Sequence, residues 1–226
     1  MRYSGKIIKG TFRKRTGRFT AICNVNGSDV ACHVRNTGRL EDLLLPGGDV
    51  FLLEAGNRER KTPFDIIAVT KGNHTVNIDS SVPNTVAEEY IRTLYPPDHL
   101  IKREVKTENS RFDLAVSSPE GHVTYIEVKG CTKEKEGICS FPDAPSKRAL
   151  KHVNELSSLS LTGYGAVIIF VVQMEGMKYF TPDDGIMPEF RSALRNALRC
   201  GVKILVLSAS VAPESVTASG TIPAVI

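Results

Sequence analysis

The sequence predicts a two-domain protein, with an all-β domain over residues 1–80 and an α/β domain over residues 81–226. Two observations predict this division. Up to Ser80 the chain is a series of short β-rich segments separated by turn residues, with no helical pattern of useful length. After Ser80, helical periodicity alternates with apolar runs of strand length, which is typical of an α/β domain. A chain of 226 residues is long enough to give both domains a core.

Five segments of the first domain are typical of strands: 6–12, 18–25, 29–34, 49–55 and 64–69. Turn sequences containing Gly, Asn or Pro separate them, and the last of these turns spans 56–63. Short strands joined in this way favour a small barrel or sandwich, and an OB-like barrel is one candidate.

The second domain combines three predicted helices with five predicted strands. The helices are expected within 80–97, 143–163 and 188–201, with Asn84 as a candidate N-cap of the first. The strands are expected over 100–106, 111–116, 123–130, 165–173 and 202–211. The run 165–173 is almost entirely apolar, which is typical of a central strand that is covered on both faces.

The composition is that of an ordinary folded protein, at 41% hydrophobic and 24% charged residues, which argues against wholesale disorder. The opening residues MRYSGKIIKG contain no apolar segment of the signal-peptide kind, and no apolar run is long enough to span a bilayer. We therefore expect a cytoplasmic protein that does not contact membranes. The five cysteines form no C-x-x-C pair, which argues against a zinc site.

Positive charge is concentrated at the start of the chain, although the net charge is only +4. Seven cations precede the first acid, Asp29: Arg2, Lys6, Lys9, Arg13, Lys14, Arg15 and Arg18. Such a segment suits a polyanion such as nucleic acid, because each neutralised phosphate releases counterions. A solvated basic surface explains it equally well, so charge alone leaves both interpretations open.

Three ionisable residues stand inside two strand-like apolar runs, RFDLAV and YIEVKG. If these runs form a hairpin centred on Glu120, Asp113 lies opposite Glu127. The period of two then puts Asp113, Glu127 and Lys129 on one face and Phe112 on the other. Directly opposite Cβ atoms are about 5 Å apart, so the two carboxylates can converge on one cation.

A metal site is one interpretation of this face, because Mg²⁺ or Mn²⁺ removes the repulsion between two close carboxylates. Asp113 and Glu127 are the expected ligands, and Glu104 is a further candidate. Lys129 is placed to act on a metal-associated water or on phosphate charge. The other interpretation is a solvated hairpin face whose Glu–Lys pair adds little stability.

Longer stretches of the chain resemble a known family. The pieces HVRNTGRL, PGGDV, VNIDSSVPN, SRFDLAV, YIEVKGCT, FPDAPSKRALKHVNEL and AVIIFVV occur in this order. SRFDLAV with YIEVKGCT resembles the core of the PD-(D/E)XK nuclease superfamily, and the whole set resembles the sugar fermentation stimulation protein family. The resemblance implies an OB-like nucleic-acid-binding domain followed by a restriction-endonuclease-like domain, with a mixed sheet flanked by helices.

The resemblance also implies roles for individual residues. Asp113 and Glu127 match the acids that hold the metal in such nucleases, and Lys129 matches the lysine that acts at the attacking water. Phe112 stands where the superfamily name has proline, a common departure that leaves the chemistry in place. These three ionisable residues are therefore the expected catalytic set.

Nine residues are expected to contact nucleic acid, on three different grounds. The basic start of the chain contributes Arg13, Lys14, Arg15 and Arg18, and the family match contributes Asn36 and Thr37. One side of the helix expected within 143–163 contributes Arg148, Lys151 and His152. The alternative for that helix is a solvated face, and the alternative for His152 is a bond to a neighbouring residue.

Two functions are consistent with these patterns. One is a metal-dependent endo- or exonuclease of the PD-(D/E)XK type that acts on DNA, with RNA as the less favoured substrate. The other is a nonspecific DNA-binding or regulatory protein whose nuclease-like site is weak or idle. A homodimer is a candidate assembly for either function.

Overall fold

The computed structural model describes residues 1–57 and 59–226 of the chain. Internal contacts divide these residues into two compact units. The barrel unit comprises Met1–Val82 with Gln173–Glu175 and Ala209–Thr217. The sheet unit comprises Pro83–Val172, Gly176–Ser208 and Ala218–Ile226. The sequence predicts a single boundary at residue 80 and does not indicate that two short segments of its second half belong to the first unit.

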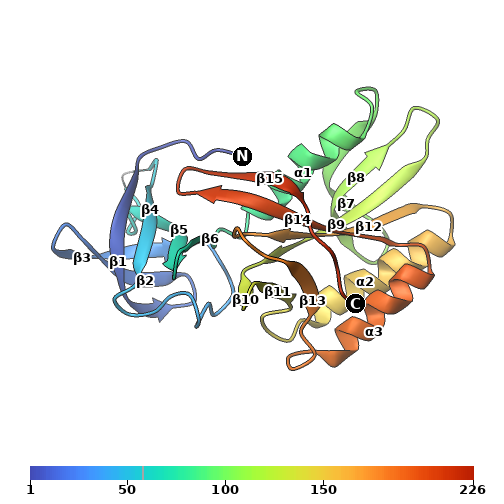
Figure 1. Cartoon of the computed structure of the whole chain (residues 1–226). Helices are drawn as coiled ribbons and strands as arrows, with labels where there is room; N and C mark the ends of the chain where they lie inside the picture. Colours follow the sequence, from blue (N-terminus) through green and yellow to red (C-terminus); the bar gives the residue numbers. More distant parts are fainter. Residues whose placement is uncertain (58) are drawn as a thin grey trace. The chain divides into compact units, whose positions relative to one another are not determined.

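The barrel unit contains the strands β1 (Ile7–Gly17), β2 (Thr20–Val25), β3 (Ser28–Val34), β4 (Asp49–Glu54), β5 (Phe64–Lys71) and β6 (His74–Asn77). The strands follow the order β3-β2-β1-β4-β5-β6, and parallel pairing of β3 with β5 closes five of them into a ring (Figure 1). The predicted OB barrel is therefore confirmed, while β6 was not predicted. The turn predicted over 56–63 includes Arg58, which lies outside the described residues.

The interior of the barrel follows from alternation along its strands. On β2, Ala21, Cys23 and Val25 are buried while the residues between them are half-buried. Gly10 on β1 is required by close approach, because a Cβ there would lie 2.7 Å from Cδ1 of Leu52. The same Cβ would lie 3.0 Å from the backbone oxygen of Asn24, so a larger residue would force its neighbours to shift.

The sheet unit contains the predicted strands and helices together with additional short strands. The strands are β7 (Leu100–Lys106), β8 (Arg111–Ser117), β9 (Val123–Cys131), β10 (Lys133–Lys135), β11 (Ile138–Phe141), β12 (Gly165–Val172), β13 (Tyr179–Pro182), β14 (Lys203–Ala212) and β15 (Ser215–Thr221). The helices are α1 (Val82–Leu94), α2 (Lys147–Leu161) and α3 (Pro188–Arg199). The last residues of β14 and the first of β15 fall in the segment assigned to the barrel unit.

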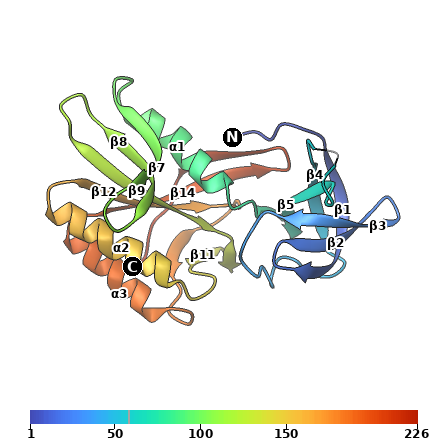
Figure 2. The same ribbon diagram turned by 180° about the vertical axis from the view of Figure 1, so that it is seen from behind.

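The main sheet has the order β15-β14-β12-β9-β8-β7 and is mixed. Strand β12 runs parallel to β9 and β14, whereas β9 and β7 each run antiparallel to β8. Seven of the eight residues of β12 are buried, which confirms its predicted central position. Helices α2 and α3 pack against each other, and α2 also packs on β12 (Figures 1 and 2). A second sheet joins β10, β11 and β13.

The helix starts differ in detail from the sequence prediction. Helix α1 begins at Val82, so Asn84 lies in its first turn and is not the N-cap that the sequence predicts. Helix α2 begins after Ser146, whose Oγ accepts the backbone N–H of Ala149 at 3.2 Å. None of the helices that the structure describes is long and apolar enough to cross a membrane.

Candidate active site

The hairpin of β8 and β9 carries the three ionisable residues that the sequence singles out. The ladder ends with Leu114 opposite Ile126, so the next opposite positions belong to Asp113 and Glu127. The predicted register is confirmed for the paired residues 114–117 and 123–126, and Asp113 and Glu127 are the residues directly beyond the end of this paired region.

The carboxylate of Asp113 is held from two sides at the point where the ladder stops. Its Oδ2 accepts the backbone N–H of Val128 at 2.8 Å, and its Oδ1 accepts a hydrogen bond from Nδ2 of Asn84 at 3.0 Å. Asn84 comes from the first turn of α1, so α1 and β9 together fix this carboxylate on β8. Asp113 is half-buried, which leaves part of it open to solvent.

Phe112 departs from the predicted alternation. The sequence predicts its ring on the face opposite Glu127. Its ring centroid instead lies 5.7 Å from that of Tyr125 and 5.9 Å from that of His152, which contacts Glu127. The prediction is wrong because the ladder between β8 and β9 begins only at Leu114, so Phe112 pairs with Val105 of β7 and strict alternation relative to β9 does not extend to it.

Glu127 is almost completely buried, at 1% exposure, and its two oxygens differ sharply. Oε1 accepts hydrogen bonds from Nζ of Lys129 and from Nδ1 of His152. An ionised carboxylate can only accept, so the ring proton of His152 lies on Nδ1. Among the described residues, Oε2 is the one buried side-chain nitrogen or oxygen with no hydrogen-bond partner.

The pKa values of the two acids are shifted in opposite directions. Burial, followed by the negative charge of Glu127, raises the pKa of Asp113 above its usual range. Burial acts on Glu127 in the same direction, but the hydrogen bond from His152 and the charge of Lys129 outweigh it and lower the pKa of Glu127. Glu127 is therefore the acid that keeps its charge, and a cation between the two would favour ionisation of both.

The donor set fits a hard divalent cation. A buried carboxylate oxygen without a partner is costly, and a divalent cation is one ligand that would remove this cost. The described residues contain no cluster of three or more His, Cys, Asp or Glu that could hold a metal, so water or a substrate would complete the coordination. Glu104 is exposed, with its carboxylate 2.7 Å from Nε of Arg111. Its predicted role as a third ligand stays a prediction.

His152 is 4% exposed and bonded to Glu127, so of its two expected roles the structure shows the bond to a neighbouring residue and not the contact with phosphate. It belongs to the buried stripe of α2 with Ala149, Val153 and Leu156, at helical spacing i, i+3, i+4 and i+7. A single polar residue inside an otherwise apolar stripe is the sequence signal that identifies it. Sequence reasoning also missed the contact of Asn84 with Asp113, for which the sequence carries no comparable signal.

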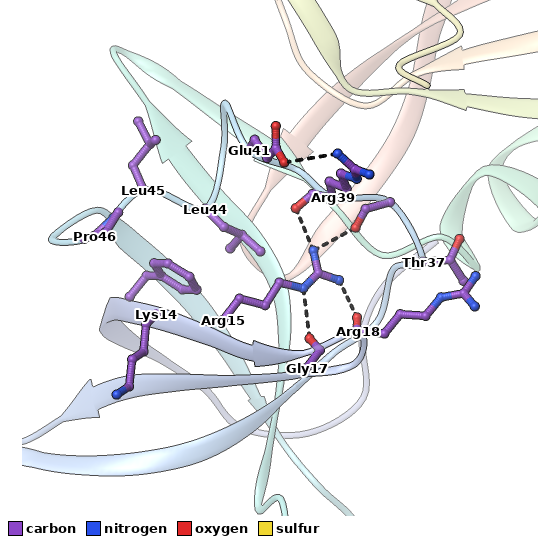
Figure 3. A pocket seen from close by; sticks show the side chains of 12 residues that line it. Lys14, Arg15, Gly17, Arg18, Thr37, Arg39, Glu41, Leu44, Leu45 and Pro46 are labelled. Carbon is purple, nitrogen blue, oxygen red and sulfur yellow. Dashed lines mark hydrogen bonds and ion pairs between the residues drawn. The ribbon is translucent and has the colours of Figure 1, made fainter. Parts of the chain in front are cut away.

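Arg15 in the barrel unit has a role different from the predicted phosphate contact. Its Nε donates to the carbonyl of Gly17, and one terminal nitrogen donates to the carbonyls of Gly38 at 2.7 Å and Arg39 at 2.6 Å (Figure 3). The other terminal nitrogen donates to the carbonyls of Arg18 and Asn36. All five guanidinium donors are thus used within the chain, which leaves none for a phosphate.

The remaining predicted nucleic-acid contacts lie on both units and stay predictions. Lys14, Arg18, Thr37 and Arg148 are exposed, and Arg13 is also exposed, 3.6 Å from Asp29. Lys151 donates to the carbonyl of Asn109 at 2.5 Å. Asn36 is used internally, because its Nδ2 donates to the carbonyl of Ile78 and its Oδ1 accepts the N–H of Gly38.

Two family models match consecutive parts of the chain. A family model described as "Sugar fermentation stimulation protein RE domain" matches residues 81–215, and one described as "SfsA N-terminal OB domain" matches residues 14–78. A sugar fermentation stimulation protein homolog from Desulfitobacterium hafniense (strain DSM 10664 / DCB-2) is 42% identical over 219 residues, covering 96% of this chain and 95% of that protein. The homolog from Ruminiclostridium cellulolyticum is 42% identical over 209 residues, covering 92% of each.

A solved structure has the same fold. It is described as the structure of Pyrococcus furiosus SfsA in complex with Ca²⁺. Its TM-score to this chain is 0.87 at 23% sequence identity, and the match covers 100% of this chain and 98% of that one. The arrangement of a barrel followed by a mixed sheet with helices is therefore shared with that protein.

Proposed function

The chain belongs to the sugar fermentation stimulation protein family, and we propose that it is a metal-dependent nuclease that binds DNA and hydrolyses its phosphodiester bonds. The observation that carries the proposal is the buried, partnerless Oε2 of Glu127, in a side chain that binds Lys129 and lies close enough to Asp113 for their charges to interact. A purely structural Glu–Lys pair would have no reason to leave one carboxylate oxygen buried and unsatisfied.

Asp113 and Glu127 would hold the cation, with Mg²⁺ or Mn²⁺ as the expected ion. A bound divalent ion would lower the pKa of a coordinated water and neutralise charge on a phosphate. The Pyrococcus furiosus protein of the same fold was solved in complex with Ca²⁺, another cation that prefers oxygen ligands. This supports a cation site in the family without fixing the ion that this chain uses.

Each neighbouring residue has a task that its contacts define. Asn84 and the N–H of Val128 hold the Asp113 carboxylate in one orientation. His152 and Lys129 both engage Oε1 of Glu127, which leaves Oε2 for the cation. The side chain of Lys129 is 17% exposed, so its ammonium can also face a phosphate or an attacking water. Asn84 and His152 are positioning residues, because they act through the two acids.

DNA binding is supported by the fold and by the charge. OB barrels commonly bind oligonucleotides. Exposed cations at the start of the chain provide the salt-dependent attraction that nonspecific DNA binding requires. The chain shows no recognisable sequence-reading motif, so contact with the DNA backbone is expected to dominate.

DNA binding without hydrolysis is a second candidate function. The observation that favours it is the small number of candidate ligands, because the described residues contain no cluster of three or more potential metal ligands. In that case Lys129 would serve mainly as the charge partner of Glu127.

Cleavage and binding measured on the same preparations test the proposal. Wild type should cut single-stranded, duplex or branched DNA when Mg²⁺ or Mn²⁺ is present. Lys129→Met should slow cleavage by about 10²-fold or more, because it removes a preorganised charge. DNA affinity should change far less, since one contact among many is lost.

Lys203→Met is the matched control, because Lys203 is exposed on β14 of the same sheet. It should cut at the wild-type rate. If wild type cuts no DNA or RNA with either ion, the binding protein is the correct function. If Lys129→Met cuts as fast as wild type, the role given to Lys129 is wrong.

A further inference from the structure

The barrel unit contains a cavity of about 600 Å³ that the proposed active site does not use. This volume lies within the range of about 300–1,000 Å³ that small-molecule sites occupy. Its walls come from the end of β1, the turn between β1 and β2, and the segment 37–46 that leads from β3 towards β4 (Figure 3). We call it the Arg15 cavity after the residue that joins these walls.

Hydrogen bonds from the Arg15 side chain to backbone carbonyls hold the walls of the Arg15 cavity together. Arg15 joins the turn at Gly17 and Arg18 to the carbonyls of Gly38 and Arg39, so the two walls cannot separate without losing these bonds. Leu40 in the same segment has a φ of 55°, a left-handed conformation that is an outlier for a bulky residue. Its carbonyl accepts the N–H groups of Leu43 and Leu44. Strain that the surroundings maintain in this way is typical of ligand sites.

The lining of the Arg15 cavity combines apolar and cationic side chains. Phe12, Leu44, Leu45 and Pro46 supply the apolar part, and the cations are Lys14, Arg15, Arg18 and Arg39. Glu41 is the one acid among the lining residues, and it lies 3.7 Å from Arg39 where both side chains are highly exposed. Such an exposed pair is weak, so an anion can displace it. A ligand with a flat apolar part and a negative charge complements this lining.

Phe19 extends the apolar surface beside the cavity. Its ring is 43% exposed, and the guanidinium of Arg18, a residue that lines the cavity, lies 5.3 Å from the ring centroid. Exposed aromatic rings next to cations are the usual stacking sites for unpaired bases. In duplex DNA the bases are stacked inside the helix and cannot enter a cavity unless they are flipped out.

We propose that the Arg15 cavity takes one unstacked base of single-stranded DNA, with the flanking phosphates on Lys14, Arg18 and Arg39. This inference rests on the proposed function and names the DNA form that the barrel unit prefers. Arg15 contributes a fixed positive charge to the wall without touching the phosphate, because its donors are already used.

A tryptophan placed in the cavity tests this directly, because the chain contains no tryptophan of its own. Leu45 is 52% exposed at the apolar wall, so Leu45→Trp introduces a single reporter without opening the core. Leu161→Trp is the control, at the exposed end of α2 in the sheet unit. A short single-stranded oligonucleotide should quench the first reporter and leave the second unchanged, and the blunt duplex of the same sequence should quench neither.

Affinity measured by fluorescence anisotropy at one salt concentration gives a second readout. Leu45→Glu should weaken single-strand binding by about tenfold, which is the scale of one lost base stack. Duplex binding should fall much less, and Leu161→Glu should match wild type on both forms. Circular dichroism of each variant should show an intact fold.

The outcomes separate this inference from the proposed function. If wild type binds no DNA, both are overturned. If wild type binds DNA but Leu45→Trp is not quenched and Leu45→Glu binds normally, the cavity proposal alone is overturned. Equal quenching by the duplex would overturn the preference for single strands, and tighter binding of the matching RNA strand would overturn the choice of DNA.

Discussion

Arg15 in the barrel unit and Glu127 in the sheet unit are two partly or wholly buried charges with opposite hydrogen-bond status. All five donors of Arg15 reach backbone carbonyls of the chain. Glu127 has both its hydrogen bonds on Oε1, while Oε2 is buried without a partner. The sequence suggested a ligand-binding role for both residues, and the structure separates them.

The difference shows that completeness of hydrogen bonding distinguishes a structural charge from a reactive one. A fully satisfied ion gains nothing from a ligand and loses stability if it is disturbed. An ion with an unsatisfied buried atom is stabilised by any partner that supplies the missing interaction. Arg15 is therefore expected to hold the walls of its cavity, and Glu127 is expected to bind a cation.

The largest expected effect is stabilisation by metal at the unsatisfied site. A ligand of the native state at a hundred times its Kd adds about 2.7 kcal/mol, which is about 5–10 °C in melting temperature for a chain of this size. Mn²⁺ should produce a shift of this order in wild type and little or none in Asp113→Asn. Thermal unfolding with and without the ion measures both.

Asp184→Asn is the control for this comparison. Asp184 is exposed and paired with Arg191 at 2.8 Å, away from the hairpin of β8 and β9. Its loss should leave the Mn²⁺ shift intact. An equal shift in wild type and Asp113→Asn would remove the cation from this pair of acids.

A smaller change in stability is expected when Arg15, whose donors are all hydrogen-bonded, is replaced. Arg15→Ala removes a cation that bridges two segments of the barrel unit, and we expect a loss of about 2 kcal/mol in the stability of that unit. Arg13→Ala should cost less than about 0.5 kcal/mol, because Arg13 has only an exposed partner at 3.6 Å. Amide hydrogen exchange of the barrel strands reports the stability of this unit alone. Equal protection in the two variants would show that Arg15 does not hold the cavity walls.

The smallest change in stability is expected at Glu88 in the sheet unit. Unlike Glu127, this acid has hydrogen-bond partners on both carboxylate oxygens. Arg92 binds its Oε1 and Arg103 binds its Oε2. Burial raises its pKa, but these two partners outweigh it and lower the pKa overall. Its contribution is therefore present above the unfolded-state pKa and is lost as the pH falls through the lower folded-state pKa.

Glu88→Gln should consequently cost about 1 kcal/mol at neutral pH, reduced by the exposure of both arginines, and the cost should shrink in acid. Urea unfolding of wild type and variant across the acidic range measures the difference. Glu108→Gln, at an exposed position, should change stability by less than about 0.5 kcal/mol. A cost for Glu88→Gln that grows as the pH falls would contradict the assignment.

Much of the fold could be predicted because its signals are local. The apolar run of β12, the periodicity of the three helices and the turns between the barrel strands each depend on neighbouring residues. Two of the strands that were missed, β6 and β10, are four and three residues long and carry little pattern of their own, whereas the missed β15 is seven residues long but rich in Ser, Thr and Gly. Short strands exist because a partner strand supplies their hydrogen bonds, which the sequence does not display.

The candidate site divides in the same way. The sequence alone predicts that Asp113, Glu127 and Lys129 share a hairpin, because the period of two and the position of the turn fix the register. Three further contacts become visible only in the folded chain: Asn84 holds Asp113, His152 is buried against Glu127, and all five donors of Arg15 bind backbone carbonyls. These contacts join segments distant in the chain, and the burial of a side chain depends on what packs over it. The burial and hydrogen bonding of a charged side chain therefore depend on partners that no local pattern of the sequence identifies.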